Sequence, residues 1–211
     1  ASRGGDLPLS FAQQRLWFLD QLEPASARYN VTLALLLTGP LDAEILKQCL
    51  TEIVRRHESL RTVITVFDGR PCQNSVPFIN LDLPVVDLSH STSEAALDLA
   101  MQQFIATEAQ RPFNLSSGSL IRSNLLSLAP DRYVLLLTLH HIAFDGWSMG
   151  ILMRELSHLY ETEISGGANR LPELPIQYAD FAEWQREWLQ GKVFDHQLDY
   201  WKRRLAGVPT R

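Results

Sequence analysis

The stretch that decides the fold is Leu139-His-His-Ile-Ala-Phe-Asp-Gly-Trp-Ser148. It continues an apolar run, Tyr133-Val-Leu-Leu-Leu-Thr-Leu139, which lacks Gly and Pro and predicts a strand buried on both faces. After Asp145 and Gly146, apolar residues recur at helical spacing as far as Ile164, so a helix with Asp145 as its N-cap is predicted. A strand, two histidines and the start of a helix together place an imidazole beside backbone N–H donors.

The two adjacent histidines are predicted to have different surroundings. Successive side chains of a strand point to opposite faces. His140 and His141 therefore cannot both line one pocket unless the strand has already ended. One ring is expected to line a site, and the other to pack or hydrogen-bond behind it. The competing interpretation is that both are structural histidines at the end of a buried strand.

Metal and covalent chemistry are not indicated by the sequence. Zinc needs at least three converging protein ligands, and no third imidazole or thiolate stands at ligand spacing beside the two diverging histidines. There is no Gly-x-Ser-x-Gly segment, and Cys49 falls on the apolar face of a predicted helix. We therefore expect no bound metal and no acyl-enzyme.

Composition narrows the class of protein further. The chain has 211 residues, 45% of them hydrophobic and 20% charged, which is typical of a globular domain. Its net charge of −5 and the lack of a basic stripe argue against a nucleic-acid partner. No apolar run approaches the ~20 residues that span a bilayer, and no signal peptide is recognised, so no membrane partner is expected. Cys49 and Cys72 form no Cys-x-x-Cys motif, and a cytoplasmic location is predicted.

Strands and helices are interspersed along the chain, which predicts an α/β or α+β fold with a mixed central sheet flanked by helices. Helices are predicted over residues 10–22, 42–57, 93–109, 146–164, 178–189 and 193–205. Strands are predicted over residues 29–37, 60–67, a short segment around Cys72, 81–86, 120–128 and 133–139. We see no internal repeat, and one domain is the simplest interpretation.

Four segments carry a resemblance to a known family, and they occur in that family's order. The segment at 140–146 fits an HHxxxDG signature, and Leu7-Pro-Leu-Ser-Phe-Ala-Gln-Gln-Arg-Leu-Trp17 resembles the family's opening motif. Arg56-His-Glu-Ser-Leu-Arg-Thr62 and Tyr178-Ala-Asp-Phe-Ala-Glu-Trp-Gln185 resemble two more. Together they resemble the condensation domains of non-ribosomal peptide synthetases, over essentially all 211 residues.

The resemblance implies a chloramphenicol-acetyltransferase-like fold. It also implies that this chain contains only part of that fold. Condensation domains have about twice this length and two similar lobes, with the active site in the cleft between them. The later motifs of the family, which lie in the second lobe, do not occur in residues 1–211. We therefore expect an N-terminal lobe without its C-terminal lobe, which by itself is inactive or nearly so.

The resemblance also implies a reaction. The α-amine of an amino acid on a downstream carrier domain attacks a thioester on an upstream carrier domain, and a peptide bond forms. His141 is implied as the catalytic residue, acting as base or by positioning the amine. The domain has no cofactor of its own, because the substrates arrive on phosphopantetheine arms of the carrier domains. The implied partners are those two carrier domains, an adjacent adenylation domain and the missing C-terminal lobe.

The remaining site residues are expected to support His141. His140 points away from it along the strand and is assigned a structural role. Asp145 is either the helix N-cap or, as the resemblance favours, one half of a buried ion pair with Arg61. Gly146 is either a plain turn glycine or a residue whose N–H stabilises the developing oxyanion.

Two other functions fit parts of this pattern. An epimerisation domain of the same superfamily shares the double histidine and removes an α-proton instead of forming an amide. A non-catalytic docking or recruitment module would retain the fold without the chemistry. Intact His141, Asp145 and Gly146 argue against loss of catalysis. Heterocyclising relatives carry aspartates in place of the first histidines, which excludes that branch.

Overall fold

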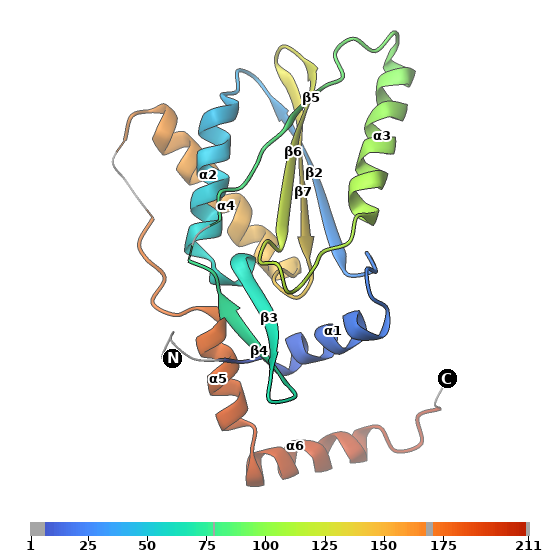
Figure 1. The fold of residues 1–211 in the computed structure, drawn as a ribbon, viewed down its shortest axis with the longest axis vertical. Helices are drawn as coiled ribbons and strands as arrows, with labels where there is room; N and C mark the ends of the chain where they lie inside the picture. The colour runs from blue at the N-terminus through green and yellow to red at the C-terminus, as the bar shows by residue number, and fades with distance from the viewer. Residues whose placement is uncertain (1–6, 78, 168–170, 210–211) are drawn as a thin grey trace.

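The computed structural model describes residues 7–77, 79–167 and 171–209. Its larger sheet has four strands in the order β2-β7-β6-β5. Within it β2, β7 and β6 pair antiparallel, whereas β5 runs parallel to β6 (Figure 1). The strands are β2 (Asn30–Thr38), β5 (Val85–Asp87), β6 (Ile121–Ala129) and β7 (Arg132–His140). The sheet is thus mixed, as the sequence predicts.

A smaller three-stranded sheet, in the order β1-β4-β3, lies below the larger one in Figure 1. Its strands are β1 (Leu7–Pro8), β3 (Thr62–Phe67) and β4 (Arg70–Ser75). The predicted strand at 60–67 starts late, because Glu58–Arg61 forms a 3₁₀ turn between α2 and β3. The predicted strand at 81–86 is replaced by the shorter β5, three residues long.

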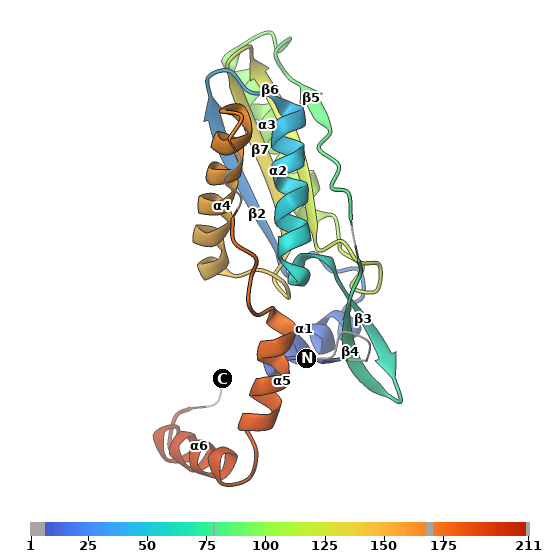
Figure 2. The ribbon, with the colours of Figure 1, turned by 90° about the vertical axis from the view of Figure 1, so that its left-hand side faces the viewer.

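Helices cover both faces of the larger sheet. Figures 1 and 2 show α2 and α4 together on one face and α3 on the other. The helices are α1 (Phe11–Leu22), α2 (Ala43–Arg56), α3 (Glu94–Gln110), α4 (Gly146–Ile164), α5 (Tyr178–Trp188) and α6 (Gly191–Arg204). The predicted fold class, a mixed sheet flanked by helices, is therefore confirmed.

Side-chain caps set where the helices begin. The hydroxyl of Ser10 accepts from the Gln13 N–H, and the Gln13 amide accepts in turn from the Ser10 N–H. Asp42 and Ser93 cap α2 and α3 through their side chains as well. Such caps satisfy backbone donors that the first turn of a helix leaves unpaired. The predicted starts of these three helices lie within one residue of the observed ones, whereas α6, which has no side-chain cap, begins two residues before its predicted start.

The alternation of β7 divides the core into two layers. Leu135, Leu137 and Leu139 are completely buried in the cluster that α2 and α4 cover. Val134 packs in a separate cluster with Leu97 of α3. Both faces of β7 are therefore covered, as its unbroken apolar sequence predicts. The consequence for the site is a rigid strand that ends at His140.

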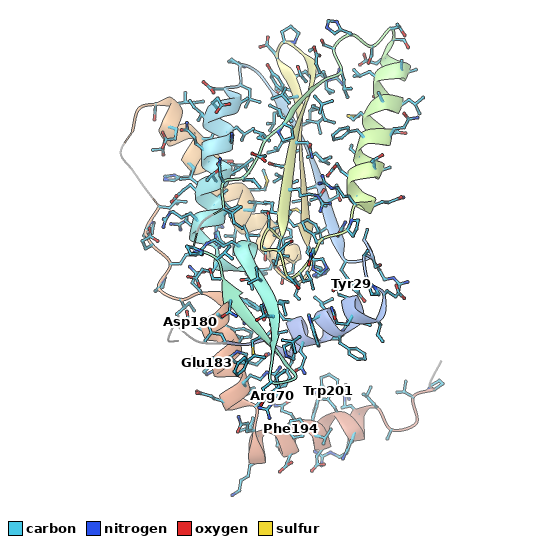
Figure 3. The ribbon with its side chains drawn as sticks, viewed as in Figure 1. Tyr29, Arg70, Asp180, Glu183, Phe194 and Trp201 are labelled. Atoms are coloured by element: carbon cyan, nitrogen blue, oxygen red, sulfur yellow. The ribbon has the colours of Figure 1, made fainter. Side chains whose placement is uncertain are left out.

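Helices α5 and α6 extend away from the layered core, at the bottom of Figures 1 and 2. The start of α5 contacts β1 and the 3₁₀ turn, whereas no described residue of α6 is buried. Phe194 and Trp201 of α6, labelled in Figure 3, remain about half exposed. A search of the described helices for one long and apolar enough to cross a membrane found none.

Candidate active site

His140 is enclosed on the α3 side of β7. Only 2% of its surface is exposed, and its Nδ1 accepts a hydrogen bond from the Ile142 N–H at 3.1 Å. Its ring also contacts Phe113, 6.0 Å between centroids, and Tyr29, which Figure 3 labels, at 6.4 Å. Burial lowers the pKa of His140 to about 4, with a smaller contribution from His141. The ring is thus neutral near neutral pH, as a structural role requires.

His141 lies one residue beyond the strand, in an exposed turn. Its backbone N–H donates to the Tyr29 carbonyl at 2.8 Å, which ties the turn to the segment before β2. Its side chain lines a surface cavity, unlike that of His140. The structure therefore separates the two histidines in the way that strand alternation predicts.

The cavity beside His141 has a volume of about 330 Å³ and lies where the turn, the end of α2 and the start of α5 meet. Its lining includes apolar side chains together with hydroxyl, imidazole and carboxylate groups. Among the described residues that line it there is no Lys or Arg. They are His57, Ser59, His141, Ile142, Ala143, Phe144, Asp145, Ser148, Leu174, Ile176, Gln177, Tyr178 and Phe181.

Asp145 caps α4 and does not form the expected ion pair. Its Oδ1 accepts from the Ser148 N–H at 2.9 Å and from the Ser148 hydroxyl at 2.6 Å. These bonds, and more weakly the charge of His141, lower the pKa of Asp145 below its usual value. The N-cap interpretation is confirmed, and the predicted pair with Arg61 is wrong for this structure. A short side chain at a helix start is satisfied most easily by its own first turn.

Arg61 instead supports the junction between the 3₁₀ turn and the smaller sheet. Its guanidinium donates to the carbonyls of Arg55 and Val76 and to the Ser75 hydroxyl. Glu58 lies 3.7 Å away as a charge partner. Arg61 thus holds the end of α2 against β4, and its support of the site is indirect.

Gly146 is the first residue of α4, and nothing in this chain requires a glycine there. Its φ lies outside the left-handed region that favours glycine. A Cβ placed on it would meet no atom of the described residues within 4 Å. The space around this Cβ position is therefore open, while the Ser148 N–H of the same helix turn is occupied by Asp145.

A buried ionic cluster beside the cavity was not predicted from the sequence. The Glu155 carboxylate lies 2.8 Å from His57 Nε2 and 3.3 Å from Arg56 Nε. Burial opposes ionisation of Glu155, but the hydrogen bonds from His57 and Arg56 outweigh it, and its pKa is lowered. The adjacent His57 and Glu58 indicate no local pair, because neighbouring residues of a helix do not face each other. The sequence offers one sign of this cluster: Glu155 falls on the apolar face of the predicted helix at 146–164, where a carboxylate needs a partner.

The other candidate chemistries find little support. Over the described ranges, no three His, Cys, Asp or Glu side chains cluster as metal ligands would. Both cysteines are buried and unbridged. Burial raises the pKa of Cys49 to about 11, with Glu163 adding to the effect, so its thiol is a poor nucleophile near neutral pH.

Comparison with known families identifies the class of this chain. Residues 4–210 match the family described as "Condensation domain". The chain belongs to this family, the condensation domains of non-ribosomal peptide synthetases.

Its relatives are large synthetases. The chain is 46% identical over 206 residues to a linear gramicidin synthase from Brevibacillus parabrevis, covering 98% of this chain and 3% of that protein. It is 45% identical over 205 residues to the phosphinothricin tripeptide synthetase PhsC of Streptomyces viridochromogenes, covering 97% of this chain and 19% of that protein. The chain thus corresponds to a small part of either relative.

Solved structures agree with the fold. The first condensation domain of the CDA synthetase superposes with a TM-score of 0.86 at 22% identity, over 98% of this chain and 52% of that one. The X-domain solved with OxyB from teicoplanin biosynthesis gives 0.84 at 28% identity, over 100% of this chain and 46% of that one. The chain spans about half the length of these structures.

Proposed function

We propose that the site around His141 forms peptide bonds between two carrier-bound substrates, as an amide-forming acyltransferase. The observation that carries this proposal is the exposed His141, which lines a cavity that also reaches Asp145 and Ser148 at the start of α4. Membership of the condensation family supplies the reaction class. In that reaction the α-amine on the downstream carrier attacks the thioester carbonyl on the upstream carrier.

The groups in the cavity suit this chemistry. The attacking nitrogen loses a proton as the C–N bond forms, and the upstream thiolate leaves as the tetrahedral intermediate collapses. An imidazole can accept such a proton as a general base, and this typically raises the rate by ~10²–10⁴-fold. If His141 acts instead by positioning, it holds the amine by a hydrogen bond. The Gly146 N–H at the start of α4 is our candidate donor to the oxyanion.

The partners follow from the same proposal. The substrates arrive on phosphopantetheine arms of upstream and downstream carrier domains, beside an adenylation domain. We further propose that residues 1–211 form the N-terminal lobe and that a C-terminal lobe closes the cleft. The first condensation domain of the CDA synthetase is about twice as long as this chain, which supports this division. The lobe alone is then inactive or nearly so.

The test is a condensation assay on a complete domain that includes this lobe, with loaded upstream and downstream carriers. His141→Ala is expected to lower kcat by ~10²–10⁴-fold. His141→Gln keeps a hydrogen-bonding side chain without a proton acceptor, so its retained activity measures positioning. Near-normal rates in both variants would refute a role for His141. Efficient dipeptide formation by residues 1–211 alone would refute the division into lobes.

A further inference from the structure

A second histidine lines the same cavity. His57 follows α2, and 23% of its side chain is exposed. It faces the cavity together with His141 and Asp145, although it comes from a different part of the chain. The cavity therefore holds two imidazoles in different settings, since only His57 is anchored by a buried carboxylate.

The anchor defines which nitrogen of His57 carries the proton. Glu155 is buried, with 7% of its surface exposed, and its lowered pKa keeps it ionised. An ionised carboxylate only accepts hydrogen bonds, so His57 Nε2 must be the donor across the 2.8 Å contact. In a neutral ring the remaining nitrogen, Nδ1, is then a hydrogen-bond acceptor. Among the described residues, Glu155 is the hydrogen-bond partner of this ring.

Arg56 makes this arrangement rigid. Arg56 is 4% exposed, and its guanidinium contacts the same Glu155 oxygen as His57 and donates to the Pro172 carbonyl at 3.0 Å. The carboxylate is thus held between α2 and α4 and cannot follow a ligand into the cavity. Such anchoring fixes the tautomer and orientation of an imidazole.

The cavity is suited to a group that donates hydrogen bonds and bears positive charge. Its lining includes the ionised Asp145 carboxylate and two serines, Ser59 and Ser148. No arginine or lysine stands among its described lining residues. An ammonium or amine has two or three N–H donors and complements such a lining.

We propose that His57 is the residue that binds the acceptor amino group, with Nδ1 accepting a hydrogen bond from its N–H. Glu155 and Arg56 are positioning residues that act through His57. This inference rests on the proposed function, and it assigns different roles to the two histidines of the cavity. His57 holds the nitrogen, while His141 acts at the moment of attack.

The substitution that isolates this role is His57→Gln. The glutamine amide N–H can replace Nε2–H as the donor to Glu155, but its acceptor oxygen stands one bond further from Cγ than Nδ1 does and cannot take the place of Nδ1. In a complete condensation domain, with an aminoacyl-pantetheine as acceptor probe, KM for the acceptor is expected to rise by about tenfold or more. KM for the donor thioester is expected to stay unchanged. His158→Gln on α4, outside the cavity lining, serves as the control and should change neither value.

Two outcomes of this assay overturn the proposal. One is an unchanged acceptor KM in folded His57→Gln, and the other is an equal rise in both KM values. Measuring probe binding in a His141→Ala background separates this inference from the proposed function. There, a tenfold weaker Kd on adding His57→Gln supports the binding role, whatever the effect of His141 on the rate.

The tautomer gives a test that needs no variant. If Nδ1 accepts the amine N–H, nitrogen NMR of the histidine rings in the wild-type domain shows the proton of His57 on Nε2 and none on Nδ1. Addition of the acceptor probe should then shift Nδ1 more than Nε2. A ring protonated on Nδ1 in its neutral form, or an Nδ1 signal that ignores the probe at saturation, contradicts the proposal.

Discussion

His140 and His141 are adjacent in sequence, but their rings face opposite surroundings. His140 is 2% exposed and accepts a hydrogen bond from the Ile142 N–H, whereas His141 lines the open cavity. The separation follows from strand geometry, since His140 is the last residue of β7 and packs against Phe113 and Tyr29, whereas His141 lies beyond the strand. A buried neutral ring thus fixes the turn from which His141 projects.

The burial of His140 predicts that stability falls as the pH is lowered. Its folded pKa is about 4, and its unfolded pKa is about 6.5. Between these values the unfolded chain binds more protons, so acidification from about pH 6.5 to 4 favours unfolding, by up to about 3 kcal/mol. Urea unfolding across this window measures the effect. His140→Asn should flatten it, whereas the exposed-site variant His196→Asn should not; a matching slope in His140→Asn would contradict the assignment.

Asp145→Ala tests the cap. Loss of a helix N-cap costs about 0.5–2 kcal/mol, whereas breaking one side of a buried ion pair costs about 3–5 kcal/mol. We expect the smaller value from chemical denaturation, and a still smaller loss for Asp145→Asn, which can cap equally well. Because the folded pKa of Asp145 is lowered, its contribution is present above its unfolded pKa and disappears as the pH falls. A loss of about 3–5 kcal/mol in the free energy of unfolding would instead support a buried ion pair between Asp145 and Arg61.

Glu155→Ala should be far more disruptive than a surface substitution. It leaves the buried Arg56 guanidinium without its carboxylate, which typically costs about 3–5 kcal/mol. The control is Glu173→Ala, because Glu173 pairs with Arg55 at 2.6 Å but is 74% exposed. That pair should contribute less than about 1 kcal/mol. Equal losses of unfolding free energy in the two variants would show that the cluster is not a structural ion pair.

Gly146→Ala separates a turn glycine from a functional one. No described atom opposes an added Cβ, and the backbone does not need glycine, so the stability should change by less than about 0.5 kcal/mol or improve. If substrate passes close to this helix start, the condensation rate of the complete domain should fall at least tenfold despite normal folding. Thermal unfolding measures the change in stability, and the condensation assay measures the change in rate. A normal rate would assign Gly146 to the turn alone.

Much of the fold was predictable because its signals are local. Asp145 is recognisable as a cap from its own side chain before an apolar stripe, and Ser10, Asp42 and Ser93 prove to be caps at the starts of three other predicted helices. Helix α4 was predicted to the residue for this reason. The short β5 was overestimated, because an apolar segment becomes strand only where a neighbouring strand pairs with it.

The contacts of the site depend on residues that are far apart in sequence. Glu155 and His57 are 98 positions apart in sequence, and the periodicity of apolar residues does not predict that they form a hydrogen bond. The expected Arg61–Asp145 pair was wrong for the same reason, since each side chain found closer partners when the elements packed. Which distant residue a polar side chain contacts depends on how the helices and strands pack. A local sequence pattern does not contain this information.

The sequence by itself determined the family, the order of the elements and the opposite facing of His140 and His141, because these follow from motifs and from a two-residue repeat along one strand. Only the tertiary structure decided what surrounds His141. It placed His57 in the same cavity, and it anchored that ring through Glu155. The reason is physical: a buried charge must be paired, and the fold, not the sequence neighbourhood, supplies the partner.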